Sequence, residues 1–170
     1  MKKVLLAIDG MTPDRKAFSY AVALCQRIRA ELSIFQIIRP RFYREYGKKI
    51  RKKGLLARKF VEGSMVAATF AEAGEHEIAN EIMAQARNNI EQLLPESERA
   101  AISCHMTIRS GCLGEEIVRY VNEHRDVVLT VYDTAPAEKL EGGVVAKQGD
   151  NPSKIKEHLS IPLVVVRSEG

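Results

Sequence analysis

Short apolar runs alternate along this chain with segments whose apolar residues recur at helical spacing. Continuous runs occur at Lys3–Ile8, Leu32–Ile38 and Asp126–Tyr132. Such runs are typical of strands buried on both faces of a parallel sheet. A looser alternation at Ala101–Arg109 and an apolar run at Pro162–Arg167 predict two further strands. The pattern therefore predicts five strands.

Helices are predicted between these strands. The first begins at Thr12-Pro13-Asp14, with Thr12 as a hydroxyl N-cap and Pro13 at the first helical position. A long amphipathic helix begins at Glu75 and ends at Pro95. Two shorter helices open at Gly114 and at Asn151-Pro152. Strand and helix alternating along the whole chain predict an α/β fold with a doubly wound sheet.

The predicted sheet also indicates where a ligand would bind. In doubly wound sheets, ligands lie beyond the carboxyl ends of the strands, where the strand order reverses. Asp9 follows the first strand, and Tyr132 and Asp133 end the fourth. Asp9 either binds a nucleoside or closes the turn between strand and helix.

Composition is that of one globular domain. The chain has 170 residues, of which 45% are hydrophobic and 28% charged. No apolar run approaches the roughly 20 residues that span a bilayer, and Val4–Ile8 is too short for the core of a signal peptide. Three cysteines without regular spacing argue against a disulfide framework. We therefore expect a cytoplasmic protein.

The net charge of +4 is unevenly placed. Residues 39–59 carry ten of the 26 basic side chains and one of the 22 acidic ones, so the rest of the chain is acidic. We interpret residues 39–60 as a basic insertion, either a solvated loop or helix, or a contact surface. The surface would suit an acidic protein partner, an anionic membrane surface or RNA. Its basic patch comprises Arg41, Arg44, Lys48, Lys49, Arg51, Lys52 and Lys53.

The sequence shows no convincing catalytic or metal-binding constellation. The four histidines are scattered, and Cys104 and His105 are adjacent in a predicted strand, which places them on opposite faces. Cys112, in the turn before a helix, is either a redox-sensitive thiol or an inert one. We expect neither a catalytic residue nor a metal ligand.

Four segments together resemble the universal stress proteins: K-K-V-L-L-A-I-D-G at the N-terminus, I-R-S-G-x-x-x-E-E-I-V from Ile108, D-V-V-L-T-V from Asp126 and I-P-L-V-V-V-R from Ile161. The resemblance implies one domain over residues 1–170 and a five-stranded parallel sheet in the order 3-2-1-4-5. It also implies a cytoplasmic stress-response or regulatory role. Homodimers of the family pair through the last strand, which here comprises Pro162, Leu163, Val164, Val165 and Val166.

Many members of that family bind ATP with an acid at the end of the first strand, which Asp9 matches. The resemblance adds four further candidate cofactor contacts, Ala7, Ile37, Gly111 and Gly149. The family's phosphate loop has the form G-x2-G-x9-G-S/T.

In this chain the three glycines of that loop would fall at Pro136, Lys139 and Gly149, and Asp150 would replace the hydroxyl residue. Proline lacks an N–H for a phosphate, and a carboxylate repels one. Gly142 and Gly143 could rebuild the loop if gaps are allowed.

Three functional hypotheses follow. The first is a stress-response homodimer that acts through protein contacts and has weak or lost ATP binding. The second is an ATP-binding nucleotide switch or slow ATPase. The third is an adaptor that docks on a membrane surface or RNA through the basic patch.

Overall fold

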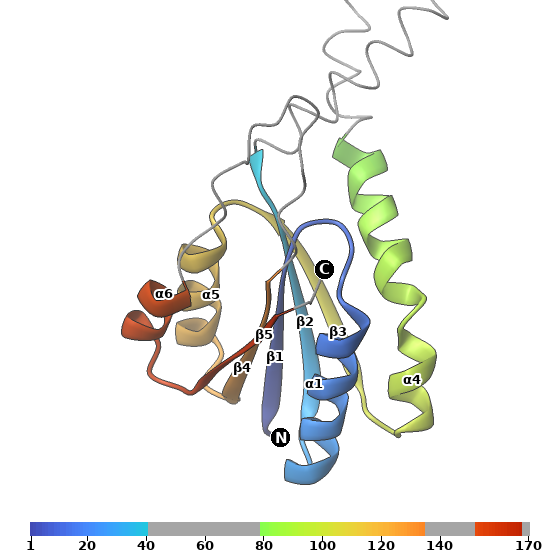
Figure 1. Ribbon diagram of the computed structural model, residues 1–170, viewed down its shortest axis with the longest axis vertical. Coiled ribbons are helices and arrows are strands. Elements are labelled where there is room, and N and C mark those ends of the chain that lie inside the picture. Colours follow the sequence, from blue (N-terminus) through green and yellow to red (C-terminus); the bar gives the residue numbers. More distant parts are fainter. Residues whose placement is uncertain (41–78, 135–151, 168–170) are drawn as a thin grey trace, which may run out of the picture.

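The computed structural model describes residues 1–40, 79–134 and 152–167, which form a five-stranded sheet with helices on both faces (Figure 1). The strand order is β3-β2-β1-β4-β5, and every neighbouring pair is parallel. The doubly wound fold and its order 3-2-1-4-5 are thereby confirmed. The strands are β1 (Lys3–Asp9), β2 (Glu31–Ile38), β3 (Cys104–Ser110), β4 (Val127–Thr134) and β5 (Leu163–Arg167).

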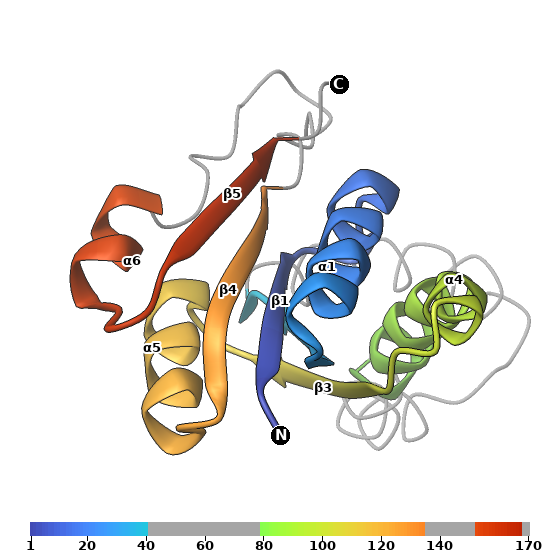
Figure 2. The ribbon, with the colours of Figure 1, turned by 90° about the horizontal axis from the view of Figure 1, so that it is seen from below.

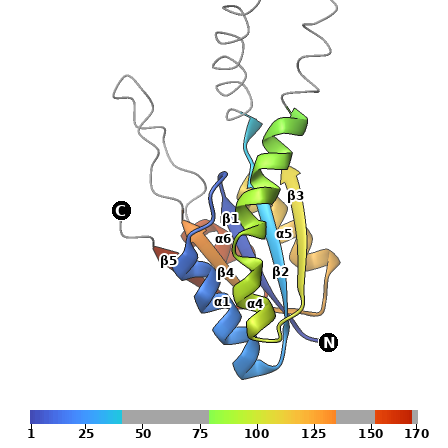
Figure 3. The same ribbon diagram turned by 90° about the vertical axis from the view of Figure 1, so that its right-hand side faces the viewer.

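The helices divide between the two faces of the sheet. Figure 2 shows α5 and α6 on one face and α1 and α4 on the other, and Figure 3 shows α1 and α4 side by side over the sheet. No helix in the three described ranges is long and apolar enough to cross a membrane. The helices are α1 (Arg15–Ile28), a helical segment at residues 79–91, α4 (Leu94–Arg99), α5 (Leu113–Glu123) and α6 (Pro152–His158).

β1 lies at the centre of the sheet and supplies the core on both faces. Val4, Leu6 and Ile8 pack in the cluster that includes α1, while Leu5 and Ala7 pack in the cluster that includes α5. All five are at most 1% exposed. Since full burial of a side chain such as leucine contributes roughly 1.5–3 kcal/mol, this double burial explains why the first apolar run is continuous rather than alternating.

The predicted strands are found within at most three residues of their expected bounds, but the predicted cap of the first helix is wrong. The helix begins at Arg15, and Asp14 is its N-cap, with the side chain accepting a hydrogen bond from Lys16 N. A carboxylate is at least as good a cap as a hydroxyl. Thr12 and Pro13 therefore belong to the loop that precedes the helix.

The helix expected from Glu75 to Pro95 is two helices. The described part of the first covers residues 79–91, and α4 follows after a two-residue turn. Pro95 lies in the first turn of α4, where its missing N–H costs no hydrogen bond. The proline therefore starts the second helix rather than ending the first, and Glu75 lies outside the described residues.

Candidate functional site

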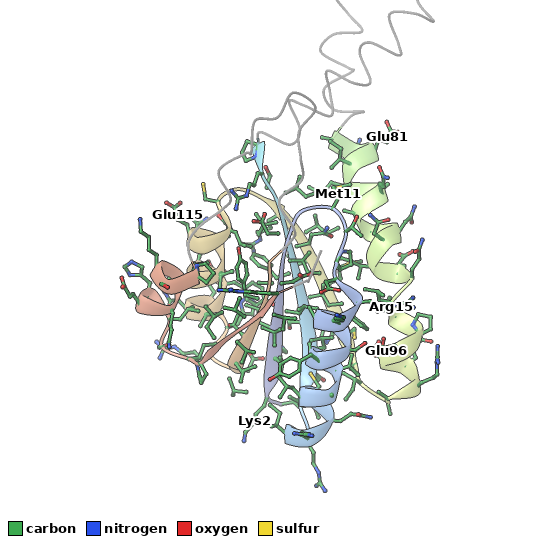
Figure 4. The ribbon with its side chains drawn as sticks, viewed as in Figure 1. Lys2, Met11, Arg15, Glu81, Glu96 and Glu115 are labelled. Carbon is green, nitrogen blue, oxygen red and sulfur yellow. The ribbon has the colours of Figure 1, made fainter. Side chains whose placement is uncertain are left out.

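The strand order reverses beside β1, because the chain continues to β2 on one side and β4 lies on the other. The loop between β1 and α1 lies over this reversal. Met11 marks the loop in Figure 4 at the opposite end of the sheet from Lys2. This is the edge at which doubly wound sheets bind ligands.

Asp9, at the end of β1, forms a two-point ion pair with Arg39. Arg39 Nε donates to Asp9 Oδ1 at 3.1 Å, and Arg39 Nη2 donates to Asp9 Oδ2 at 2.7 Å. The side chain of Asp9 is 18% exposed and that of Arg39 is 33% exposed. Paired charge-assisted bonds of this kind are stronger and more directional than a single contact. Both carboxylate oxygens of Asp9 thus already accept hydrogen bonds.

The loop after β1 is held by side chains from three other elements. Gln36 Nε2 on β2 donates to Gly10 O at 2.5 Å, and Asn89 Nδ2 donates to Met11 O at 2.9 Å. At the far end of the loop, Asp14 N donates to Asp133 Oδ2 at 2.7 Å. We call these residues 10–14 the anchored loop. Its anchors fix the backbone that any ligand at this edge would meet.

Asp133 is the buried member of this site. It is 2% exposed, and its Oδ1 has no hydrogen-bond partner among the described residues. The pKa of the Asp133 carboxyl is raised to about 6, chiefly by burial. The hydrogen bond from Asp14 N favours the charged form and lowers the pKa, whereas the negative charges of Asp14 and Asp9 raise it. Asp133 therefore titrates far closer to neutral pH than an ordinary aspartate.

Ala7, Ile37 and Tyr132 lie at the predicted edge, but their side chains are enclosed. Ala7 and Ile37 are 0% exposed and Tyr132 is 3% exposed. Tyr132 and Phe35 are the register partners of Ala7 on the two neighbouring strands and pack in the same core cluster. Only backbone atoms of Ala7 and Ile37 could contact a ligand.

Gly111 closes the turn between β3 and α5. Its φ is +154°, and a Cβ there would lie 3.2 Å from Glu116 Cγ. Glu116 in turn accepts a hydrogen bond from Arg119 at 3.1 Å and lies 3.6 Å from Arg109 Nη1. The glycine thus makes room for a carboxylate between two arginines, a structural reason for the I-R-S-G segment.

The three cysteines and the histidines form no metal site in the described ranges. Burial raises the pKa of the Cys25 thiol to about 12, and burial likewise raises the pKa of Cys104. These two thiols are therefore poor nucleophiles at neutral pH. Cys112 is exposed and is the N-cap residue of α5.

β5 is the last strand of the described sheet and pairs with β4. Leu163, Val164, Val165 and Val166 are all partly buried, and Pro162 O accepts a hydrogen bond from Thr130 N at 3.0 Å. The outer edge of this apolar strand faces no other strand of the described sheet. The predicted dimer strand thus lies at the edge of the described sheet, and its use in a dimer stays a prediction.

Two groups of predicted site residues lie outside the described residues. One is Gly149 with the rest of the phosphate loop. The other is the basic patch from Arg41 to Lys53. Sequence reasoning placed Asp9, Tyr132 and Asp133 at this edge. It missed Arg39, Gln36 and Asn89, for which the only signal was polarity in or beside an apolar segment.

Comparisons with known proteins agree with this geometry. The sequence matches the model of the universal stress protein family over residues 1–167. The structure resembles universal stress protein UspA from Lactobacillus plantarum, with 17% identity, a TM-score of 0.62 and coverage of 98% of this chain and 97% of that one. No curated protein matches the sequence.

Two further similar structures hold nucleotides. A universal stress protein from Archaeoglobus fulgidus in complex with dAMP has 9% identity and a TM-score of 0.53, covering 97% of each chain. One from Arabidopsis thaliana with AMP bound has 13% identity and a TM-score of 0.51, covering 100% of this chain and 94% of that one.

Proposed function

Because this chain belongs to the universal stress protein family, we propose that it is a cytoplasmic stress-response protein that acts as a homodimer through protein contacts. In this proposal, ATP binding is weak or lost, and the protein is not a turnover enzyme. The supporting observation is the ion pair between Asp9 and Arg39.

The ion pair competes with any nucleoside for Asp9. A hydroxyl or amino group can bind Asp9 only if it displaces a charge-assisted hydrogen bond from Arg39. Because the pair is only partly buried, it contributes about 1 kcal/mol. Each 1.4 kcal/mol changes a dissociation constant about tenfold, so the pair alone weakens binding through Asp9 by roughly fivefold to tenfold.

One neighbour of Asp9 adds to this effect. Once ionised, Asp133 would repel phosphate groups placed over the end of β4. The sequence of the following segment, with Pro136 and Asp150, supports the same reading.

The homodimer is supported by the edge strand β5. Within the described sheet β5 has a strand on one side only, and an apolar edge strand of this kind is suited to pairing with another strand. Val164 belongs to none of the core clusters of the described residues. Pairing with the same strand of a second copy would cover it and satisfy the edge.

A nucleotide-binding function is the second candidate. Two structures with the same fold carry dAMP and AMP, and Asp9 lies at the edge where doubly wound sheets bind ligands. In that reading a bound nucleotide displaces Arg39 from Asp9, and the protein acts as a nucleotide switch or slow ATPase.

The basic patch favours a third candidate, an adaptor on an anionic membrane surface or RNA. The ten basic side chains within residues 39–59 support this candidate. Binding through them would weaken steeply as salt is added. Deleting residues 41–58 would abolish it while leaving the described sheet intact.

Calorimetric titration with ATP, ADP and AMP, with and without magnesium, separates the first two candidates. The proposal predicts only millimolar binding of all three. A micromolar dissociation constant for any of them contradicts it and makes the nucleotide switch the leading function.

The dimer is tested by light scattering on Val164→Lys, which introduces a charge at the open edge without removing a core residue. We expect a monomer from this variant and a dimer from the wild type and from Tyr20→Lys, a control at an exposed apolar position of α1. A monomeric wild type at micromolar concentration contradicts the dimer.

A further inference from the structure

Two buried carboxylate oxygens lie without donors at the start of α1. Asp133 Oδ2 accepts from Asp14 N at 2.7 Å, but Asp133 Oδ1 has no partner among the described residues. Asp14 Oδ1 accepts from Lys16 N at 3.0 Å, and Asp14 Oδ2 is likewise buried and without a partner there. The hydrogen bond from Asp14 N therefore joins two carboxyl groups that each keep one unsatisfied oxygen.

The charges around Asp133 do not compensate it. From β1, Asp9 faces it with a negative charge that Arg39 neutralises. From the start of α1, Asp14 faces it with a second negative charge. No basic side chain in the described ranges forms an ion pair with Asp133 or Asp14. The positive end of the α1 dipole is the favourable contribution, and it typically amounts to only about 0.3–1 kcal/mol.

A buried, unpaired carboxylate is costly, and the usual response of a protein is to keep the group protonated. A proton on Oδ1 removes the buried charge. Oδ2 remains free to accept from Asp14 N. Ionisation leaves a buried charge on Asp133, and its desolvation, the largest cause of the raised pKa, is relieved when the loop end moves away from β4 and water reaches the carboxylate. The hydrogen bond from Asp14 N opposes this movement, and the negative charge of Asp14 favours it.

We propose that the protonated side chain of Asp133 holds the anchored loop against β4, and that the loop loosens at Asp14 when Asp133 ionises. The elevated pKa of Asp133, about 6, places this change between about pH 5 and 7. The other two anchors, Gln36 and Asn89, do not titrate. The loosening is therefore confined to the Asp14 end of the loop. The proposal goes beyond nucleotide binding and does not depend on it.

The test is a pH titration of the full-length, ligand-free chain by NMR from pH 4.5 to 8. We expect the Asp133 side-chain carboxyl carbon and the Asp14 amide to titrate together with a midpoint near pH 6. Over the same range, exchange of the Asp14 amide should rise on the order of tenfold beyond its intrinsic pH dependence. The amides of Gly10 and Met11 should not show this excess.

Asp133→Asn supplies the matched variant, because an amide keeps the shape and the acceptor but cannot ionise. It should abolish the Asp14 titration and the excess exchange. Asp126→Asn, which replaces a partly exposed aspartate paired with Lys3 just before β4, should leave both unchanged. An Asp133 carboxyl that titrates below pH 4.5 in the wild type overturns the proposal without any variant. An Asp14 titration that persists in Asp133→Asn overturns it as well.

Discussion

Asp9 and Asp133 end neighbouring parallel strands at the same edge of the sheet, and the fold stabilises them in opposite ways. Asp9 is partly exposed and accepts two hydrogen bonds from the guanidinium of Arg39. Asp133 is buried and accepts one backbone N–H, without a basic partner in the described ranges. Asp9 thus has a basic partner, whereas burial raises the pKa of the Asp133 carboxyl to about 6.

The difference teaches that a position at the carboxyl end of a strand does not decide what an acid can do. A carboxylate that is already paired is a poor acceptor for a ligand, because the ligand must displace the pair. A buried carboxyl with an unsatisfied oxygen responds instead to protons. One edge of the sheet therefore carries two different acids side by side: Asp9, whose oxygens already accept hydrogen bonds, and Asp133, which responds to pH.

The largest expected effect comes from removing the titration of Asp133. Its pKa is about 6 in the fold and about 3.9 when unfolded, so the folded state binds more protons between these values and stability falls as pH rises. We expect Asp133→Asn to gain up to about 2–3 kcal/mol relative to the wild type between pH 4 and 7.5. Urea unfolding of both proteins at several pH values measures this.

The control for that series is Asp126→Asn, which should show the same decline as the wild type between pH 5 and 7.5. The pKa of Asp126 is lowered, first by its hydrogen bond with Lys3, so it contributes its pH dependence at lower pH. A constant stability difference between Asp133→Asn and the wild type at all pH values would show that the buried acid does not titrate in this range.

A smaller effect is expected from the ion pair of Asp9. A double-mutant cycle with Asp9→Asn and Arg39→Met should give a coupling of about 1 kcal/mol, because the pair is only partly buried. The cycle for Lys3 and Asp126, in which Lys3 Nζ lies 2.7 Å from Asp126 Oδ2, should give less. Equal couplings would mean that the two-point geometry adds nothing. Thermal or urea unfolding supplies the free energies.

The smallest effect separates the two acids by their response to salt. Raising ionic strength shortens the Debye length from about 10 Å at 0.1 M to about 3 Å at 1 M. The Asp9–Arg39 coupling should then shrink by a few tenths of a kcal/mol. The pH-dependent gain of Asp133→Asn should hardly change, because burial causes it. Repeating both measurements in 1 M salt tests this contrast. An unchanged coupling between Asp9 and Arg39, or the loss of the stability gain of Asp133→Asn, contradicts it.

The sheet could be predicted from the sequence because its strands are buried on both faces and therefore read as apolar runs. Val4–Ile8 is such a run, and its strand is found where expected. The strand order came from the family resemblance and is confirmed. The edge that carries Asp9 and Asp133 followed from the same fold rule.

The hydrogen-bond partners at that edge could not be predicted, because they depend on strand register and on how far side chains from distant parts of the sequence extend. Arg39 follows Asp9 by 30 positions, and Asn89 lies 78 positions from Met11. Neither spacing carries a local signal. The cap of α1 was misplaced for a different reason. Thr12 and Asp14 both carry side chains that can cap a helix, and the structure shows Asp14 as the cap. The contact of Asp133 with the backbone N–H of Asp14 comes from another strand and has no local signal.

The central claim is that Arg39 withholds Asp9 from a ligand, and ATP binding to Arg39→Ala tests it most directly. By calorimetry we expect this variant to bind ATP on the order of tenfold more tightly than the wild type, the equivalent of about 1.4 kcal/mol. Arg119→Ala, which removes an exposed arginine paired with Glu116 instead, should leave the affinity unchanged. An Arg39→Ala affinity equal to or weaker than that of the wild type would contradict the account; a weaker one would make Arg39 a ligand contact rather than a competitor.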